Sequence, residues 1–224
     1  MKTADKRSRL REGIRHNPAL LPHFHDRSNR HGLGIDMHPM TAIGLLWLAW
    51  LASWVAASAW ADRTEKRVGV RAEIRYRMPL VLGTILVFIP SRGHAAVPRF
   101  WAPTSAESWA CVALVAAGIA FCWWARLHLG RLWSGEVTRK AGHHVVESGP
   151  YALVRHPIYS GLLLSIYATM AARGTLWVVA GTIALTLGIW LKARLEERFL
   201  REELGSAYDD YARRVPMLVP FMPR

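Results

Sequence analysis

Long uncharged stretches constrain most what this chain can fold into. Met40–Ala61, Trp109–Ala125 and Gly174–Leu191 contain no Asp, Glu, Lys, Arg or His. The first exceeds the roughly 20 residues that an α-helix needs to cross the hydrocarbon core of a bilayer. A fourth run, Ile158–Ala172, is shorter, but apolar residues 151–154 can extend it. These four runs predict transmembrane helices.

A fifth segment, Met78–Pro90, is the weakest candidate because Pro90 ends it. It can cross if Tyr76 and Arg77 snorkel to the interface at one end. The predicted fold class is therefore all-α. We expect a polytopic membrane bundle of about five helices, in which residues 158–191 form a C-terminal helical hairpin.

This pattern divides the chain into three parts. Residues 1–39 form a tail rich in Arg and His, with the composition of a disordered segment. Residues 40–125 hold the first three transmembrane helices. Residues 126–224 hold a basic connection, the hairpin and a C-terminal segment.

The C-terminal segment is expected to be mainly helical. Lys192–Leu204 has high helix propensity, and Gly205 is a helix stop. A short helix around Tyr208–Arg214 follows, and its tyrosines are expected to pack. The apolar ending, residues 215–223, is suited to lying back against the bundle or the membrane surface.

The net charge of the chain is +13, a value that also suits nucleic-acid binding. Here, however, the basic residues lie beside apolar runs, as expected of segments that face anionic lipid headgroups. We therefore expect a bilayer and no nucleic acid as partner. Cys111 and Cys122 lie about three helical turns apart, too far to pair with each other. Two cysteines provide neither a disulfide framework nor a zinc site, and no metal is expected.

The loop charges predict the orientation in the membrane. Asp62–Arg77 and residues 126–155 are rich in Lys and Arg, whereas Ser91–Ser108 holds only two arginines. By the positive-inside rule, the two basic connections and the C-terminus are cytoplasmic. This scheme places the basic N-terminal tail outside. Either the tail is an exception to a statistical rule, or the native chain starts at Met37 or Met40.

Polar side chains cluster where the hairpin begins, although such groups cost free energy in hydrocarbon. The groups are His143-His144-Val145-Val146 with Gly149-Pro150-Tyr151, then Arg155-His156-Pro157-Ile158-Tyr159 with Gly161, and Glu196-Glu197 beyond the last span. Pro157 suits the first turn of a helix, where Arg155 and free N–H groups can hold a carboxylate. Tyr151 and Tyr159 offer aromatic faces for an adenine ring or a sulfonium cation. Glu196 can accept hydrogen bonds from ribose hydroxyls.

Each group also has a purely structural interpretation. His143 and His144 suit a solvated loop, and Arg155 and His156 suit interfacial anchors. Glu196 lies among arginines, as on a salt-bridged helix surface. The occurrence of all three groups, in order, around one hairpin favours a functional site.

This ordered set resembles the isoprenylcysteine carboxyl methyltransferase family and the related phospholipid N-methyltransferases. The resemblance covers roughly residues 127–223. The matching positions are His143-x-Val145-Val146-x-x-Gly149-x-Tyr151, Arg155-His156-Pro157-x-Tyr159-x-Gly161, Glu196-Glu197, Gly205, Tyr208-x-x-Tyr211, Val215-Pro216 and Pro220.

The resemblance implies an integral membrane enzyme that uses S-adenosylmethionine. The family's cofactor contacts correspond to Glu136, His143, His144, Val145, Val146, Tyr151, His156, Pro157, Ile158, Tyr159 and Glu196. The family tends to have Gln where Glu136 stands. Arg155, His156 and Glu196 are the expected catalytic residues. Lys192 occupies the position of a substrate-contacting Arg, and it offers a point charge in place of a bidentate fork.

Methyl transfer from a sulfonium mainly requires alignment of donor and nucleophile and exclusion of water. We expect a lipidic or membrane-partitioned acceptor that enters from the bilayer, with the active site facing the cytoplasm. If the organism is a bacterium, the membrane is its inner membrane. Carboxylate O-methylation is favoured, and N-methylation of an amine headgroup, assisted by His156 or Glu196, stays open. The alternatives from other classes are an NADPH-dependent membrane reductase and a non-catalytic membrane protein.

Overall fold

In a computed structural model of the protein, residues 37–58, 64–67, 70–89, 98–130, 138–140 and 145–222 are described. Residues 1–36 of the expected N-terminal tail lie outside these ranges. The helices are α2 (Pro39–Ser58), α3 (Val70–Phe88), α4 (Ser105–Leu129), α5 (Pro157–Arg173), α6 (Leu176–Leu204) and α7 (Ser206–Arg214), and a 3-10 turn, η3, covers Gly149–Ala152. The predicted helical bundle is therefore confirmed within these ranges.

Two short strands were not predicted. β1 (Thr64–Arg67) pairs antiparallel with β2 (Thr138–Lys140) and joins the two basic connections. Both strands are short and polar, so they lack the apolar alternation that marks a strand in a sequence.

Three helices are long and apolar enough to cross a membrane: α2, α4 and α6. The shorter predicted span near residues 158–172 is also a helix, α5. The weakest candidate forms the end of α3, which begins at Val70 and carries Pro79 inside it. Part of the expected loop Asp62–Arg77 is thus helical.

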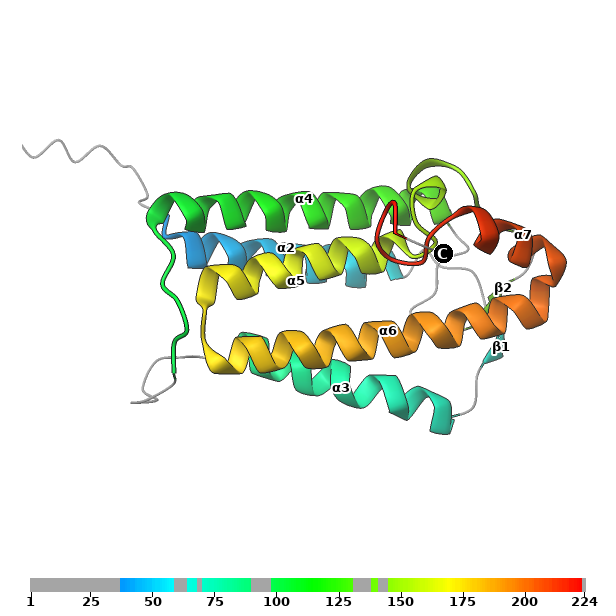
Figure 1. Ribbon diagram of the computed structural model, residues 1–224, viewed down its shortest axis with the longest axis horizontal. Coiled ribbons are helices and arrows are strands. Elements are labelled where there is room, and N and C mark those ends of the chain that lie inside the picture. The colour runs from blue at the N-terminus through cyan, green and yellow to red at the C-terminus, as the bar shows by residue number, and fades with distance from the viewer. Residues whose placement is uncertain are drawn as a thin grey trace, which may run out of the picture. The chain divides into compact units, whose positions relative to one another are not determined.

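The helices pack as two close pairs, α3 with α6 and α4 with α5, while α2 lies against α4 (Figure 1). Glycines permit this closeness, because small residues allow helix backbones to approach. A Cβ added to Gly118 on α4 would lie 2.5 Å from the Gly161 carbonyl oxygen on α5. A Cβ on Gly181 of α6 would lie 2.8 Å from the Gly83 carbonyl oxygen on α3.

A tight turn follows α5. Gly174 adopts a left-handed conformation with φ 61°, and Thr175 stands at the N-cap position of α6 without a side-chain capping hydrogen bond. Phe100 donates its backbone N–H to the Gly174 carbonyl at 2.8 Å, and the Arg173 guanidinium binds the Val87 and Ile89 carbonyls near the end of α3. These contacts fasten the turn to neighbouring segments.

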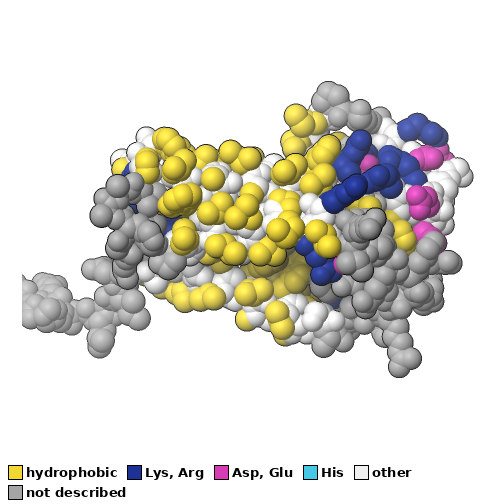
Figure 2. Space-filling model, turned by 90° about the horizontal axis from the view of Figure 1, so that it is seen from below, with side chains coloured by type: hydrophobic (Ala, Val, Ile, Leu, Met, Phe, Trp, Pro, Cys, Tyr) yellow, Lys and Arg dark blue, Asp and Glu magenta, His cyan; other side chains and the backbone are white. Residues whose placement is uncertain are grey.

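The surface divides as the sequence predicts for a membrane protein. Large apolar side chains such as Leu48, Val55, Ile85 and Ile183 are more than half exposed. The face in Figure 2 is apolar along the helices and carries its Lys and Arg side chains at the end where α7 lies. A lipid environment removes the cost of exposing this apolar surface to water.

Replacing Gly118 with Leu should force α4 and α5 apart. Overpacking of this kind costs about 1–3 kcal/mol of folding free energy. Gly44→Leu is the control, because a Cβ at Gly44 meets nothing within 4 Å. Thermal unfolding in detergent should show a lower midpoint for the first variant alone, and equal midpoints would contradict the close packing.

Candidate active site

The start of α5 is bound to the C-terminal segment. Pro157 occupies the first turn of α5, and His156 stands at the N-cap position. The backbone N–H groups of Arg155 and His156 donate to the Pro216 and Met217 carbonyls at 2.9 and 3.1 Å. The expectation that the apolar ending lies back against the bundle is confirmed for these residues.

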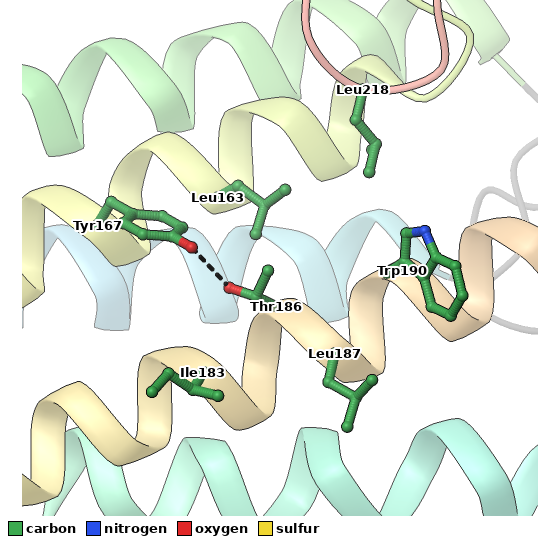
Figure 3. Close-up of a pocket in the computed structure, with 7 residues that line it drawn as sticks. All are labelled: Leu163, Tyr167, Ile183, Thr186, Leu187, Trp190 and Leu218. Carbon is green, nitrogen blue, oxygen red and sulfur yellow. Dashed lines mark hydrogen bonds between the residues drawn. The ribbon is translucent and has the colours of Figure 1, made fainter.

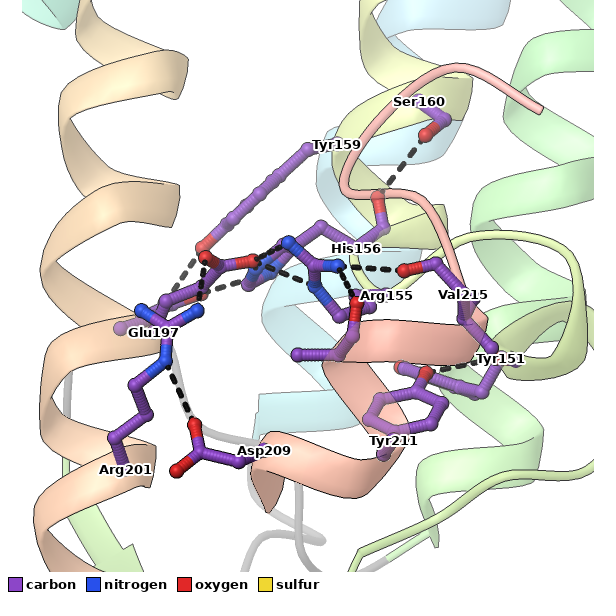
Figure 4. A network of polar contacts seen from close by, with 12 residues as sticks. Tyr151, Arg155, His156, Tyr159, Ser160, Glu197, Arg201, Asp209, Tyr211 and Val215 are labelled. Carbon is purple, nitrogen blue, oxygen red and sulfur yellow. Dashed lines mark hydrogen bonds and ion pairs between the residues drawn. The ribbon is translucent and has the colours of Figure 1, made fainter. Parts of the chain in front are cut away.

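A buried ion pair connects α5, α6 and α7 (Figure 4). Arg155 Nε and Nη2 lie 2.7 and 2.6 Å from Glu197 Oε1, with the two side chains 9% and 2% exposed. Arg155 Nη1 donates to the Ala212 and Val215 carbonyls. Arg201 lies 3.5 Å from the other Glu197 oxygen. Arg155 is therefore an internal tie between these elements.

His156 lies between two carboxylates. Its Nδ1 is 3.4 Å from Glu196 Oε2, and its Nε2 is 3.6 Å from Glu197 Oε1. Nε2 is buried and makes no hydrogen bond within the described part of the chain. Burial by itself lowers the pKa of an imidazole, but the two carboxylates outweigh burial and raise the pKa of His156 above its ordinary value.

Tyr159 and Glu196 form the second half of the cluster. The Tyr159 hydroxyl donates to Glu196 Oε1 at 2.6 Å, and its ring stacks on His156 with centroids 5.5 Å apart. Lys192 Nζ lies 5.6 Å from the Tyr159 ring centroid and 5.7 Å from that of Tyr76 on α3. We call His156, Tyr159, Lys192 and Glu196 the polar cluster.

An apolar groove lies between α5 and α6 (Figure 3). Its volume is about 380 Å³, and its lining residues are Leu163, Tyr167, Ile183, Thr186, Leu187, Trp190 and Leu218. Tyr159 and Leu163 stand one helical turn apart on the same side of α5. The groove therefore begins about one turn from the polar cluster.

Several predicted residues have local structural contacts. Val145 packs on the buried cluster that contains Tyr208 and Tyr211. The Tyr151 carbonyl accepts a hydrogen bond from the Tyr211 hydroxyl at 2.7 Å. Pro157 is fully buried, Val146 is half-buried, and the Ile158 carbonyl accepts from the Cys122 thiol at 3.3 Å. Glu136, His143 and His144 lie outside the described residues.

Sequence reasoning missed three contributors. Glu197 was noted beside Glu196, but its pairing with Arg155 joins residues that are 42 positions apart. Tyr76 was expected at a membrane interface, and its approach to Lys192 was not predicted. Leu218 lines the groove and its carbonyl accepts from the Ser160 hydroxyl. No local pattern reveals these long-range contacts. The two adjacent glutamates that follow an apolar run were the one sequence signal that indicated a functional role for Glu197.

Part of the chain is similar to a known family of proteins. The segment of residues 111–203 matches the family model of the Isoprenylcysteine carboxyl methyltransferase (ICMT) family. It extends from α4 to near the end of α6 and includes the whole polar cluster.

Three of the relatives carry names with two different methyl acceptors. Methanethiol S-methyltransferase 2 of Bradyrhizobium diazoefficiens is 44% identical over 72 residues, which are 31% of this chain and 26% of the relative. Protein-S-isoprenylcysteine O-methyltransferase B of Arabidopsis thaliana is 33% identical over 91 residues, 39% of this chain and 45% of the relative. A probable protein-S-isoprenylcysteine O-methyltransferase of Oryza sativa subsp. indica is 32% identical over 115 residues, 50% and 53% of the two chains. The chain thus spans about a quarter of the bacterial relative and about half of each plant relative.

Removing the charge of Glu197 should destabilise the protein strongly. Glu197→Gln leaves the buried Arg155 guanidinium without its counter-ion, and breaking a buried pair costs about 3–5 kcal/mol. Asp210→Asn removes an exposed ion pair with Arg213 and should cost less than about 1 kcal/mol. Denaturant titration in detergent measures both changes, and a loss for Glu197→Gln as small as the control's would refute the role of the pair.

The raised pKa of His156 predicts a stability that falls with pH. The folded state binds the proton more tightly than the unfolded chain. The stabilisation is therefore complete below about pH 6.5, the ordinary value, and disappears as the pH rises through the raised pKa. The thermal midpoint of the wild type should fall over this range, and that of His156→Asn should fall less. His38→Asn, at an exposed histidine, should retain the wild-type slope, and identical slopes for all three proteins would disprove the assignment.

Proposed function

We propose that the protein is an integral membrane methyltransferase that uses S-adenosylmethionine and methylates a lipidic or membrane-partitioned acceptor. The observation that carries this proposal is the position of the polar cluster at one end of an apolar groove between α5 and α6. A polar cofactor and an apolar acceptor can meet there from two different phases. The family model that residues 111–203 match supports the same reaction class.

The residues of the polar cluster fit the chemical groups of the cofactor. Glu196 offers acceptor oxygens for ribose hydroxyls or for an ammonium group. The ring of Tyr159 offers a face for a sulfonium. The buried Nε2 of His156, without a hydrogen bond in the described ranges, is a further group that a polar ligand can satisfy.

When bound, S-adenosylmethionine would supply a methyl group on a positively charged sulfur. The protein's contribution is to hold the acceptor atom in line with that methyl group and to exclude water. Glu196, His156 and Tyr159 would orient the cofactor, and Lys192 would hold an acidic head of the acceptor. The earlier prediction of a catalytic role for Arg155 becomes a positioning role, because its guanidinium binds Glu197 and two carbonyls. Cofactor contacts at Glu136, His143 and His144 stay predictions.

We favour a carboxylate acceptor with an apolar chain. Ligand pockets span about 300–1,000 Å³, and the groove, at about 380 Å³, lies within this range. A groove of this size suits an acceptor larger than methanethiol. S-methylation of a small thiol is the second candidate, because the bacterial relative that is 44% identical carries that name.

The proposed topology has five membrane crossings, with α3 and α5 crossing beside α2, α4 and α6. The polar cluster then faces the cytoplasm, on the side where Lys and Arg gather. α5, with 17 residues, is at the short end of the range for a membrane-spanning helix.

Loss of Glu196 acceptor oxygens should weaken cofactor binding. Glu196→Ala removes both acceptor oxygens, and Tyr159→Phe removes the hydroxyl that holds one of them. A hydrogen bond to a charged group is worth about 1.5–3 kcal/mol, so affinity should drop at least about tenfold. Calorimetry with S-adenosylhomocysteine in detergent measures this, and Asp210→Asn is the control. Unchanged affinity in both variants would remove the site assignment.

The acceptor is identified by supplying labelled S-adenosylmethionine with an isoprenylated cysteine, with methanethiol, or with extracted membrane lipid. Label should enter a carboxylate-bearing apolar acceptor. Label in methanethiol alone would establish the second candidate. Binding of NADPH without S-adenosylhomocysteine would indicate the reductase instead.

A further inference from the structure

The apolar groove is crossed by one polar contact. The hydroxyl groups of Tyr167 on α5 and Thr186 on α6 are hydrogen-bonded at 3.2 Å. Figure 3 shows the Tyr167 ring reaching from α5 toward α6, on the far side of Leu163 from Trp190 and Leu218. The contact therefore lies at the end of the groove that is remote from the polar cluster.

The Tyr167 ring is held in this position by its hydroxyl group. Thr186 also bonds the Thr182 carbonyl at 2.8 Å, so its own hydroxyl is satisfied within α6. Tyr167 is 45% exposed on a surface that faces lipid, where a hydroxyl without a partner is costly. Thr186 provides its partner within the described residues. Swinging the ring out of the groove would break this bond in hydrocarbon.

We propose that the Tyr167–Thr186 pair sets the length of the apolar chain that the groove accepts. This inference rests on the proposed function, in which the groove holds the methyl acceptor. Tyr159 and Tyr167 are eight residues apart on one side of α5, which is about 12 Å along the helix axis at about 1.5 Å per residue. A chain that starts at the polar cluster has this distance before it meets the Tyr167 ring.

The occupant is a single-chain amphiphile with an acidic head. Trp190 lines the cytoplasmic end of the groove, and the Arg194 guanidinium lies 5.7 Å from its ring centroid. Arg194 and Arg198 are exposed one turn apart on α6, and Lys192 lies in the polar cluster. Positive charge at this end complements an acidic head, while Leu163 and Leu187 contact the chain.

Binding of saturated straight-chain fatty acids of increasing length tests the proposal without any turnover. Each methylene that becomes buried should raise affinity about fourfold. In the wild type this increase should stop at a defined chain length. Tyr167→Ala opens the end of the groove and should extend the increase to longer chains. Thr186→Val removes the partner hydroxyl with little change of shape and should extend it in the same direction.

Ile183→Ala is the matched control, because it widens the same groove from α6 and leaves the bridge intact. Its chain-length limit should equal that of the wild type. An unchanged limit in Tyr167→Ala, or an equal extension in Ile183→Ala, would overturn the proposal.

Binding of S-adenosylhomocysteine to the same samples separates the two hypotheses. If Tyr167→Ala retains cofactor binding and its chain-length limit is unchanged, only the proposed role of the Tyr167–Thr186 pair is refuted. Wild-type protein that binds the fatty acids but not S-adenosylhomocysteine refutes the proposed methyl transfer, and the chain-length result stands by itself.

Discussion

The buried pair of Arg155 and Glu197 is the interaction on which the rest of the site depends. Two charges with side chains 9% and 2% exposed carry a large desolvation cost, which is offset only when every polar atom finds a partner. Here the guanidinium meets the Glu197 carboxylate and the Ala212 and Val215 carbonyls. The pair therefore fixes α6 and the end of α7 against the residues that begin α5. Because Glu196 is the next residue on α6, the same contact sets its position beside Tyr159.

The open groove results from the different packing partners of α5 and α6. α5 packs closely on α4 through Gly118 and Gly161, and α6 packs closely on α3 through Gly83 and Gly181. The two helices of the hairpin, α5 and α6, therefore pack on different neighbours and lie apart along much of their length (Figure 1). The turn at Gly174 joins them at one end, and the charged residues join them at the other. An apolar space remains between them, and the hydrogen bond between the Tyr167 and Thr186 hydroxyl groups bridges it.

Much of this architecture was predictable because it depends on local patterns. Uncharged runs located α2, α4, α5 and α6, and Gly205 marked the end of the last long helix. The beginning of α3 was missed because its first residues are charged and contribute nothing to an apolar run. The order of polar groups around the hairpin indicated the site, and His156, Tyr159 and Glu196 do lie together.

The partner of each side chain was not predictable from spacing. Arg155 was expected to provide a positive field for a ligand, but the chain returns through α7 and places carbonyls around it. Gly161 was grouped with the polar residues of the site, and it lets α4 approach α5 closely. Such outcomes depend on tertiary contacts between segments that are distant in the sequence, which composition and periodicity do not encode.

The charges at the site bear on the acceptor that it favours. His156 has carboxylates on both sides, and these raise its pKa above the ordinary value. A protonated imidazole cannot accept the proton of an ammonium or thiol acceptor. Glu196 is already bonded by Tyr159 and lies next to His156, which reduces its availability as a base. A carboxylate acceptor is ionised before it binds, so neither His156 nor Glu196 has to remove a proton from it. These charges are therefore consistent with the proposed O-methylation, which does not begin with a deprotonation.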